Sequence, residues 1–205
     1  LFKFYHKSPS KEDFFVPEAF LRTFWSLNLM DISVPLSRYQ AEIARLTTLG
    51  KPEVVLQLQQ EMKEQVGKCG KMRESLIKEK DSWFVGCKER GSIVKSVIKM
   101  ALLPRLLLGP MEAQFTAKFL FLLHSLGPRH FSTLSLLDLI FDGLCGNGQM
   151  ISSLTEGEAH CFGRFVHECL LVLQSWQLAQ EKYEREAVAP HLPGFMKRWS
   201  FSIDE

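Results

Sequence analysis

The feature that most constrains the fold is an apolar stretch between Met100 and Pro128, MALLPRLLLGPMEAQFTAKFLFLLHSLGP. A membrane-spanning helix needs roughly 18–20 consecutive apolar residues, but Arg105, Glu112 and Lys118 interrupt this stretch. Gly109-Pro110 breaks it as well, because proline lacks a backbone N–H and clashes with the preceding turn. The stretch therefore argues against a membrane span. It predicts two helices joined by a tight break, each apolar enough to be buried on several sides.

The remainder of the chain also predicts helices. No segment shows the sustained alternation of Val, Ile and Thr that is typical of strands. Apolar residues instead recur at threes and fours, as at Phe20, Phe24 and Leu27, and Thr155 with Glu158 fits a helix-starting capping box. About seven or eight helices joined by short connections tend to pack as antiparallel hairpins. We therefore predict an all-α fold, an irregular stack of helical hairpins.

One predicted helix, at about 53–83, is far more polar than the others. Its apolar residues form only a narrow seam, and its charges alternate in sign, which is typical of a solvated face. We divide the chain into an entry segment at 1–13, helical hairpins at 14–90 and a buried helical stack at 91–200. The sequence starts at Leu1 rather than Met, so we expect a fragment of a longer polypeptide.

The composition restricts the classes of partner. The net charge of +2 is close to neutral and gives no support to polyanion binding by bulk charge. Five cysteines without a CxxC pair argue against a disulfide framework or a zinc module and favour a reducing compartment.

A glycine-rich segment and a His/Cys cluster are the patterns that could suggest chemistry. Gly143-x-x-Gly146-x-Gly148 lacks the preceding strand and the following Lys-Ser/Thr of a phosphate loop, so a flexible loop is the favoured interpretation. The cluster consists of His160, Cys161, His167 and Cys169. A metal needs three or four convergent ligands, but on a helix His160 and His167 share a face roughly two turns apart, while Cys161 and Cys169 lie elsewhere around it. Buried core cysteines are the simpler interpretation.

His124 lies on the most apolar predicted helix, without a nucleophile motif near it. A core histidine with a local hydrogen bond is the favoured interpretation, and a catalytic base is the alternative. We therefore expect no enzyme, with no catalytic residues, no metal, no cofactor and no small-molecule ligand.

A locally basic stretch at 88–105 is the candidate contact site for a partner or for nucleic acid. It lies beside Trp83 and Phe84 and contains Lys88, Arg90, Lys95, Lys99 and Arg105. Basic residues near aromatic rings can bind single-stranded nucleic acid through phosphate contacts and stacking, although both aromatic residues could equally belong to the core. For Arg105 we favour a structural clamp that satisfies carbonyls at the bend near Pro104. An exposed anchor for a partner is the alternative.

Five segments, in fixed order over most of residues 20–195, resemble a known family. They are FWSLNLMDISVPLSRYQAEIARL, EKDSWF, LLPRLLLGPMEAQFTAKFLFLLHSLG, FSTLSLLDLIF and EAHCFGRFVHECLLVLQSW. Among the matching residues are Phe24, Trp25, Asp31, Pro35, Tyr39, Pro104, Arg105, Lys118, His124, Phe131, Asp138, Phe141, Gly163, Arg164 and Trp176. With these residues the chain resembles the largest subunit of the THO complex, the nuclear assembly that couples transcription to mRNA export.

The resemblance implies a scaffold rather than an enzyme. It implies a long irregular α-solenoid, partly related to MIF4G and HEAT-like helical domains, that holds the other THO subunits in the nucleus. It also implies docking of the DEAD-box ATPase of mRNA export, with contact to mRNA through the assembled complex and no membrane. An RNA-binding helical module that uses the stretch at 88–105 is the alternative.

Overall fold

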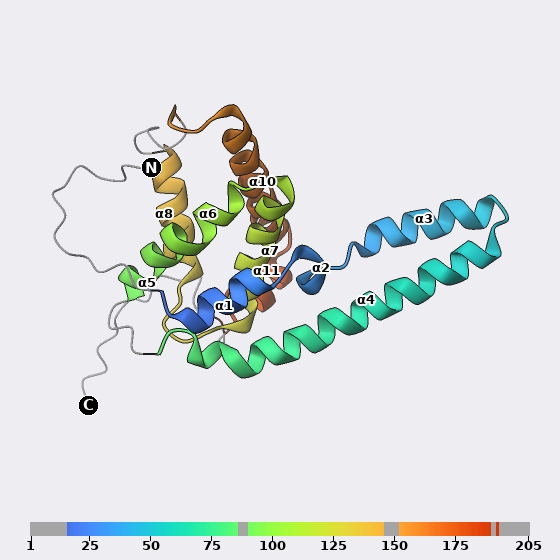
Figure 1. Ribbon diagram of the computed structural model, residues 1–205, viewed down its shortest axis with the longest axis horizontal. Coiled ribbons are helices and arrows are strands. Elements are labelled where there is room, and N and C mark those ends of the chain that lie inside the picture. Colours follow the sequence, from blue (N-terminus) through green and yellow to red (C-terminus); the bar gives the residue numbers. More distant parts are fainter. Residues whose placement is uncertain (1–15, 86–89, 146–151, 190–191, 193–205) are drawn as a thin grey trace.

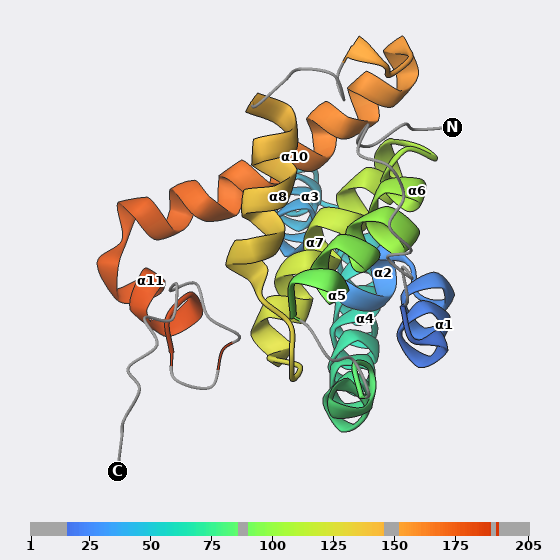
Figure 2. The same ribbon diagram turned by 90° about the vertical axis from the view of Figure 1, so that its left-hand side faces the viewer.

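The computed structural model describes residues 16–85, 90–145, 152–189 and 192, and within these ranges it contains helices and no strand. The predicted all-α stack is confirmed, with helices on two sides of α7 in the body of the molecule (Figures 1 and 2). The elements are α1 (Glu18–Ser26), α2 (Leu29–Ile32), α3 (Leu36–Thr48), α4 (Pro52–Glu79), the 3-10 turn η1 (Lys80–Ser82), α5 (Arg90–Val97), the π-helical turn η2 (Ile98–Leu102), α6 (Leu103–Leu106), α7 (Pro110–Leu126), α8 (Thr133–Cys145), α10 (Glu156–Leu178) and α11 (Gln180–Glu186).

Helices α3 and α4 form an antiparallel hairpin that projects from the body as an arm (Figure 1). Between them, Gly50 adopts a φ of 64°, which glycine tolerates without steric cost, and Pro52 occupies the first turn of α4. The predicted long polar helix is thus confirmed as α4 followed by η1. Two helices alone cannot enclose their seam, so along α4 Val55, Leu58 and Met62 are only half-buried.

The body surrounds an aromatic cluster built from segments that are distant in sequence. Phe24 of α1 lies 5.0 Å from Phe119 of α7 between ring centroids, and Phe20 lies 5.1 Å from Phe84. All four rings are almost fully buried. The cluster ties the start of the described chain to α7 and anchors the base of the arm, because Leu76 near the end of α4 belongs to the same core.

The apolar stretch at 100–128 forms η2, α6 and α7, and its two halves separate at Gly109-Pro110 as predicted. Regular α geometry gives way to the wider π turn directly before α6, where the Leu103 N–H donates to the Ile98 carbonyl, five residues back. Pro104, at the start of α6, has no N–H to continue the regular ladder. In the described part of the chain, no helix is both long and apolar enough to cross a membrane.

Helix α10 starts at the predicted capping box. The Thr155 N–H donates to Glu158 Oε2 at 2.8 Å, and the Glu158 N–H donates to Thr155 Oγ1 at 3.4 Å. The hydrogen bond from the Thr155 N–H to the Glu158 carboxylate is the main reason why the pKa of Glu158 is lowered. From there α10 packs against α7 and buries an apolar stripe, Cys161, Phe162, Phe165, Cys169 and Trp176.

Candidate interaction surfaces

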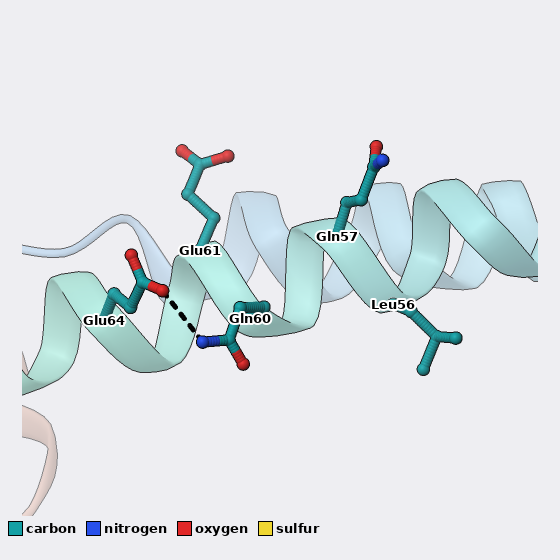
Figure 3. A pocket seen from close by; sticks show the side chains of 5 residues that line it. All are labelled: Leu56, Gln57, Gln60, Glu61 and Glu64. Carbon is teal, nitrogen blue, oxygen red and sulfur yellow. Dashed lines mark hydrogen bonds between the residues drawn. The ribbon is translucent and has the colours of Figure 1, made fainter.

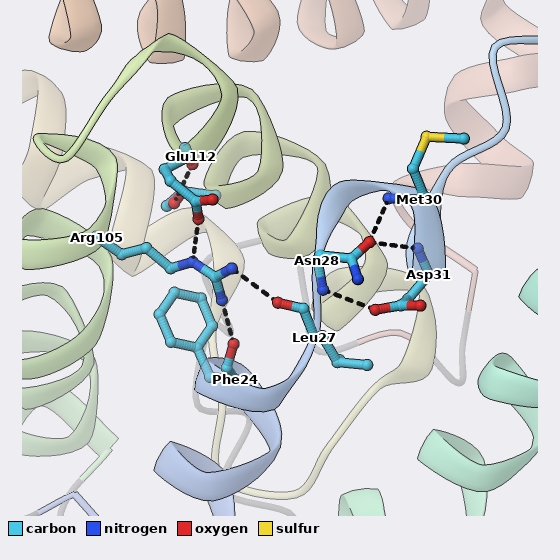
Figure 4. A network of polar contacts seen from close by, with 8 residues as sticks. Phe24, Leu27, Asn28, Met30, Asp31, Arg105 and Glu112 are labelled. Carbon is cyan, nitrogen blue, oxygen red and sulfur yellow. Dashed lines mark hydrogen bonds and ion pairs between the residues drawn. The ribbon is translucent and has the colours of Figure 1, made fainter.

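The side chain of Arg105 on α6 reaches the end of α1 and is only 5% exposed (Figure 4). Its Nη1 donates to the Phe24 carbonyl, and its Nη2 donates to the Leu27 carbonyl at 2.7 Å. The last carbonyls of a helix have no partner within the helix, and the guanidinium supplies the missing donors. Its Nε pairs with Glu112 Oε2 on α7 at 2.5 Å, and its Cζ lies 3.6 Å from the centroid of the Phe115 ring.

The corner that Arg105 holds is closed on its other side by the start of α2. Asn28 accepts hydrogen bonds from the N–H groups of Met30 and Asp31, while the Asp31 carboxylate accepts one from the Asn28 N–H at 2.8 Å (Figure 4). This reciprocal capping fixes the direction in which the chain leaves α1. Arg105 therefore faces the interior and connects α1, α6 and α7. It acts as a structural clamp, but the carbonyls that it binds belong to the end of α1 and not, as predicted, to the bend near Pro104.

Of the five basic candidates, the structure describes the side chains of Lys95, Lys99 and Arg105. Lys95 and Lys99, four residues apart, are both exposed. Lys88 lies outside the described residues, as does the side chain of Arg90, and Arg105 points into the body.

The aromatic residues beside the basic stretch do not form a surface for stacking. Trp83 and Phe84 are each 1% exposed and belong to the core, so their ring faces are unavailable to a base in this conformation. What the stretch offers within the described surface is a pair of lysines, without stacking rings.

The His/Cys residues do not converge. Cys161 and Cys169 are buried and His160 and His167 are exposed, and among the described residues no group of His, Cys, Asp or Glu could hold a metal. Burial raises the pKa of the Cys169 thiol to about 12, so it remains protonated and unreactive. The glycine-rich segment was interpreted as a flexible loop, but Gly143 lies in the last turn of α8, while Gly146 and Gly148 lie outside the described residues.

His124 is a buried side chain with two hydrogen-bond partners. Its Nδ1 lies 2.8 Å from Thr133 Oγ1, and its Nε2 lies 2.9 Å from the Glu186 carbonyl. A carbonyl can only accept, so Nε2 carries the proton in the neutral ring and Nδ1 accepts from the Thr133 hydroxyl. Burial lowers the pKa of His124, against the opposing effect of the Glu186 carbonyl. The side chain thus connects α7 with the start of α8 and the end of α11.

Two shallow hollows lie on the described surface. One lies along α4, where Leu56, Gln57, Gln60, Glu61 and Glu64 line a hollow that is widely open to solvent (Figure 3). The other lies between α2, α4, α7 and α10, beside Glu168. The Glu168 carboxylate accepts from Gln114 at 3.1 Å and pairs with Arg164 at 3.0 Å.

Sequence reasoning missed the outward face of α10. The inward stripe was visible in the spacing of Phe162, Phe165 and Cys169, but the opposite face is exposed and carries almost no charge. The signal was present in the sequence as a run without a charged residue, 169–180.

The fold and these surfaces define an all-α helical-stack protein with a projecting hairpin. Comparison with known families gives a match to the model described as "Transcription factor/nuclear export subunit protein 2" over residues 15–53 and 51–204. The chain belongs to this family, and the resemblance found in its sequence motifs is confirmed.

Individual relatives agree with the family match. The chain is 29% identical to THO complex subunit 2 of Arabidopsis thaliana over 197 residues, which cover 84% of the chain and 10% of the relative. It is 26% identical to THO complex subunit 2 of Homo sapiens over 201 residues, which cover 88% of the chain and 12% of the relative, and equally similar to that of Mus musculus. The chain thus spans about a tenth of the length of these curated relatives.

Proposed function

We propose that this chain acts as a non-enzymatic scaffold segment of a THO complex in nuclear mRNA export. In this role it would organise other THO subunits and dock a DEAD-box RNA ATPase, with mRNA reached through the assembled complex. The observation that carries the proposal is the family match, which extends over almost the whole chain and includes relatives named as subunits of that complex.

The architecture is suited to this role. A scaffold must hold separate surfaces at fixed relative positions, which requires a rigid connection between them. Here one aromatic core joins α1 and α7, and Arg105 binds the end of α1 to α6 and α7. The α3–α4 arm projects from that core, so the molecule offers the arm and the flank of the body as two separate contact regions (Figure 1).

The proposal is tested by purifying the full-length protein that contains this chain from nuclear extract of its own source. Mass spectrometry of the bound proteins should recover other THO subunits together with a DEAD-box ATPase. Purified complex should also change the rate of ATP hydrolysis by that ATPase. Recovery of neither class of protein with a folded, full-length bait would overturn the proposal.

A second candidate function is direct RNA binding, favoured by the exposure of Lys95 and Lys99. The variant Lys95→Glu with Lys99→Glu should then weaken binding of single-stranded RNA. It should also flatten the salt dependence, by roughly 0.7 in the log–log slope for each phosphate that the variant no longer neutralises. The control is Lys68→Glu with Lys71→Glu on the exposed face of α4, which changes the net charge by the same amount. Equal effects of both pairs would indicate non-specific attraction, and no effect of the first pair would exclude the site.

A further inference from the structure

The hollow between α2, α4, α7 and α10 lies where the arm joins the body (Figure 1). It has a volume of about 340 Å³ and is open to solvent. Its lining includes apolar side chains that remain partly exposed, Ile32, Phe121, Leu122 and Val172. The volume lies near the lower end of the usual range of ligand sites, so the hollow has room for a few side chains of a peptide.

Positively charged groups lie at the two ends of this apolar lining. The Arg73 guanidinium donates to Ser125 Oγ at 3.1 Å, which holds it beside α7. Lys118 comes seven residues before Ser125 on α7, roughly 10 Å along the helix axis, and Phe121 and Leu122 lie between them. A line along α7 through the hollow therefore runs from one cation, over apolar side chains, to a second cation.

Positive charge exceeds negative charge around the hollow. Glu168 is the one carboxylate among the described residues that line it, and its Oε1 is already engaged by Arg164 at 3.0 Å and Gln114 at 3.1 Å. Its Oε2 lies 4.0 Å from Lys118 Nζ, which is beyond hydrogen-bond distance. Within the part of the chain that the structure describes, Arg73 has no carboxylate partner. Three cations thus accompany one carboxylate, which leaves a formal excess of two positive charges.

The hollow along α4 has the opposite charge. Glu61 and Glu64 line it together with two glutamines, and among the described residues its lining includes no cation and a single apolar side chain, Leu56. An acidic ligand would be repelled there. The same chain therefore supplies a control site for any ligand that is selected by charge.

We propose that the hollow between α2, α4, α7 and α10 binds an extended peptide of another polypeptide in which alternate residues are acidic, apolar and acidic. Every second side chain of an extended peptide points to the same side, and its first and fifth residues lie roughly 13 Å apart. The long side chains of Arg73 and Lys118 can span that distance, so each binds one carboxylate. The apolar residue between the two acids packs on Phe121 and Leu122, which removes apolar surface from water.

The spacing of the charges also favours carboxylates over phosphate. A single phosphate would leave one of the two separated cations without a partner, and its double charge would lie on the same wall as the Glu168 carboxylate. The inference does not rest on the proposed function, because it follows from the charges and the lining of this hollow.

The test places a photo-crosslinking amino acid at Ser33, which lines the hollow, in the full-length protein within its native complex. The control position is Gln57 in the hollow along α4. Mass spectrometry should identify one segment of another polypeptide at Ser33, with acidic residues two positions before and two positions after an apolar residue. The crosslink yield should exceed that at Gln57 and should fall as the salt concentration is raised.

Charge reversal then tests the contact itself, with the captured segment as a synthetic peptide. Arg73→Glu should weaken its binding about tenfold, because an attraction becomes a repulsion. Lys71→Glu, at another exposed position of α4, changes the net charge by the same amount and should have little effect. Replacing one acidic residue of the peptide with arginine should restore binding to Arg73→Glu but not improve binding to Lys71→Glu. Circular dichroism verifies that both variants are folded.

Several results would overturn the inference. They are crosslinks confined to this polypeptide, a captured segment without the acidic–apolar–acidic pattern, and a segment bound through a phosphorylated residue. A yield at Ser33 no higher than at Gln57, or equal effects of Arg73→Glu and Lys71→Glu, would overturn it as well. The proposed function is judged separately, by whether the unmodified protein recovers THO subunits. Recovery of those subunits together with any of these results would leave the function standing and remove only the peptide site.

Discussion

The two long helices, α4 and α10, differ in how much of their surface is buried and in the composition of the part that is exposed. The 28 residues of α4 include a single fully buried side chain, Leu76, and its apolar seam is covered mainly by α3 in the arm. The 23 residues of α10 bury five side chains against the body, while the opposite face is exposed and nearly uncharged. Exposure therefore has different meanings in the two helices. The exposed residues of α4 are largely charged and solvated, whereas those of α10 include leucines and resemble an interface in composition.

The largest expected difference between the two regions lies in the cost of removing a core side chain. Phe119→Ala should lower the free energy of unfolding by about 3–5 kcal/mol, because the ring is fully buried against Phe20, Phe24 and Phe115. Met62→Ala in the half-buried arm seam should cost about 1 kcal/mol or less. Urea denaturation of both variants measures this. Equal costs would mean that the arm is as tightly packed as the body.

Two arginine–glutamate pairs provide the next contrast. Arg105→Met keeps much of the side-chain volume but leaves the Phe24 and Leu27 carbonyls and the Glu112 carboxylate without their donor. We expect a loss of about 2–3 kcal/mol in thermal or urea unfolding, because unpaired buried polar groups are costly. The matched control is Arg45→Met, whose exposed pair with Glu42 on α3 lies in solvent and should contribute nothing measurable. If Arg105→Met left the free energy of unfolding unchanged, the contacts of Arg105 would not be needed for stability.

The glycines in the middle of α4 should allow the arm to be stabilised. A Cβ added at Gly67 or Gly70 meets no atom within 4 Å, and the helix runs without interruption through both positions. Each change to alanine should therefore add about 0.5–1 kcal/mol to the local stability of the arm. Slower hydrogen exchange of the α4 amides is the readout, because the arm can open without unfolding the body. Faster exchange would mean that the added methyl groups meet an obstacle.

The smallest effect that we predict concerns pH and the body. Burial lowers the pKa of His124 in the folded state, so below its usual value of about 6.5 the unfolded chain takes up a proton that the folded chain resists. Stability should fall as the pH decreases from about 7.5 to about 5.5, above the range in which carboxylates titrate. At the higher pH, His124→Asn should have a lower free energy of unfolding than the unmodified protein. On acidification it should lose less of that free energy. His160→Asn, at an exposed position of α10, controls for the loss of an imidazole.

Local sequence chemistry predicted most of the elements. The capping box at Thr155 and the break at Gly109-Pro110 depend on neighbouring residues alone, and the structure has both. Among the basic candidates the same reasoning grouped Arg105 with Lys95 and Lys99. In the structure the Arg105 side chain is buried, whereas Lys95 and Lys99 are exposed. The direction of a long flexible side chain depends on unpaired groups within its reach. For Arg105 these are carbonyls that lie 78 and 81 residues away in sequence.

Hydrophobic periodicity, prolines and helix-start residues determined that this chain forms helices, and the ordered motifs determined its family, because both are properties of short segments and their spacing. The tertiary structure decided which face of each helix stays in water. The apolar seam of α4 and that of α10 have the same periodicity, yet one is half-covered, mainly by α3, and the other is buried against the body. Burial depends on how many elements meet at a surface, and that number is a property of the assembled fold.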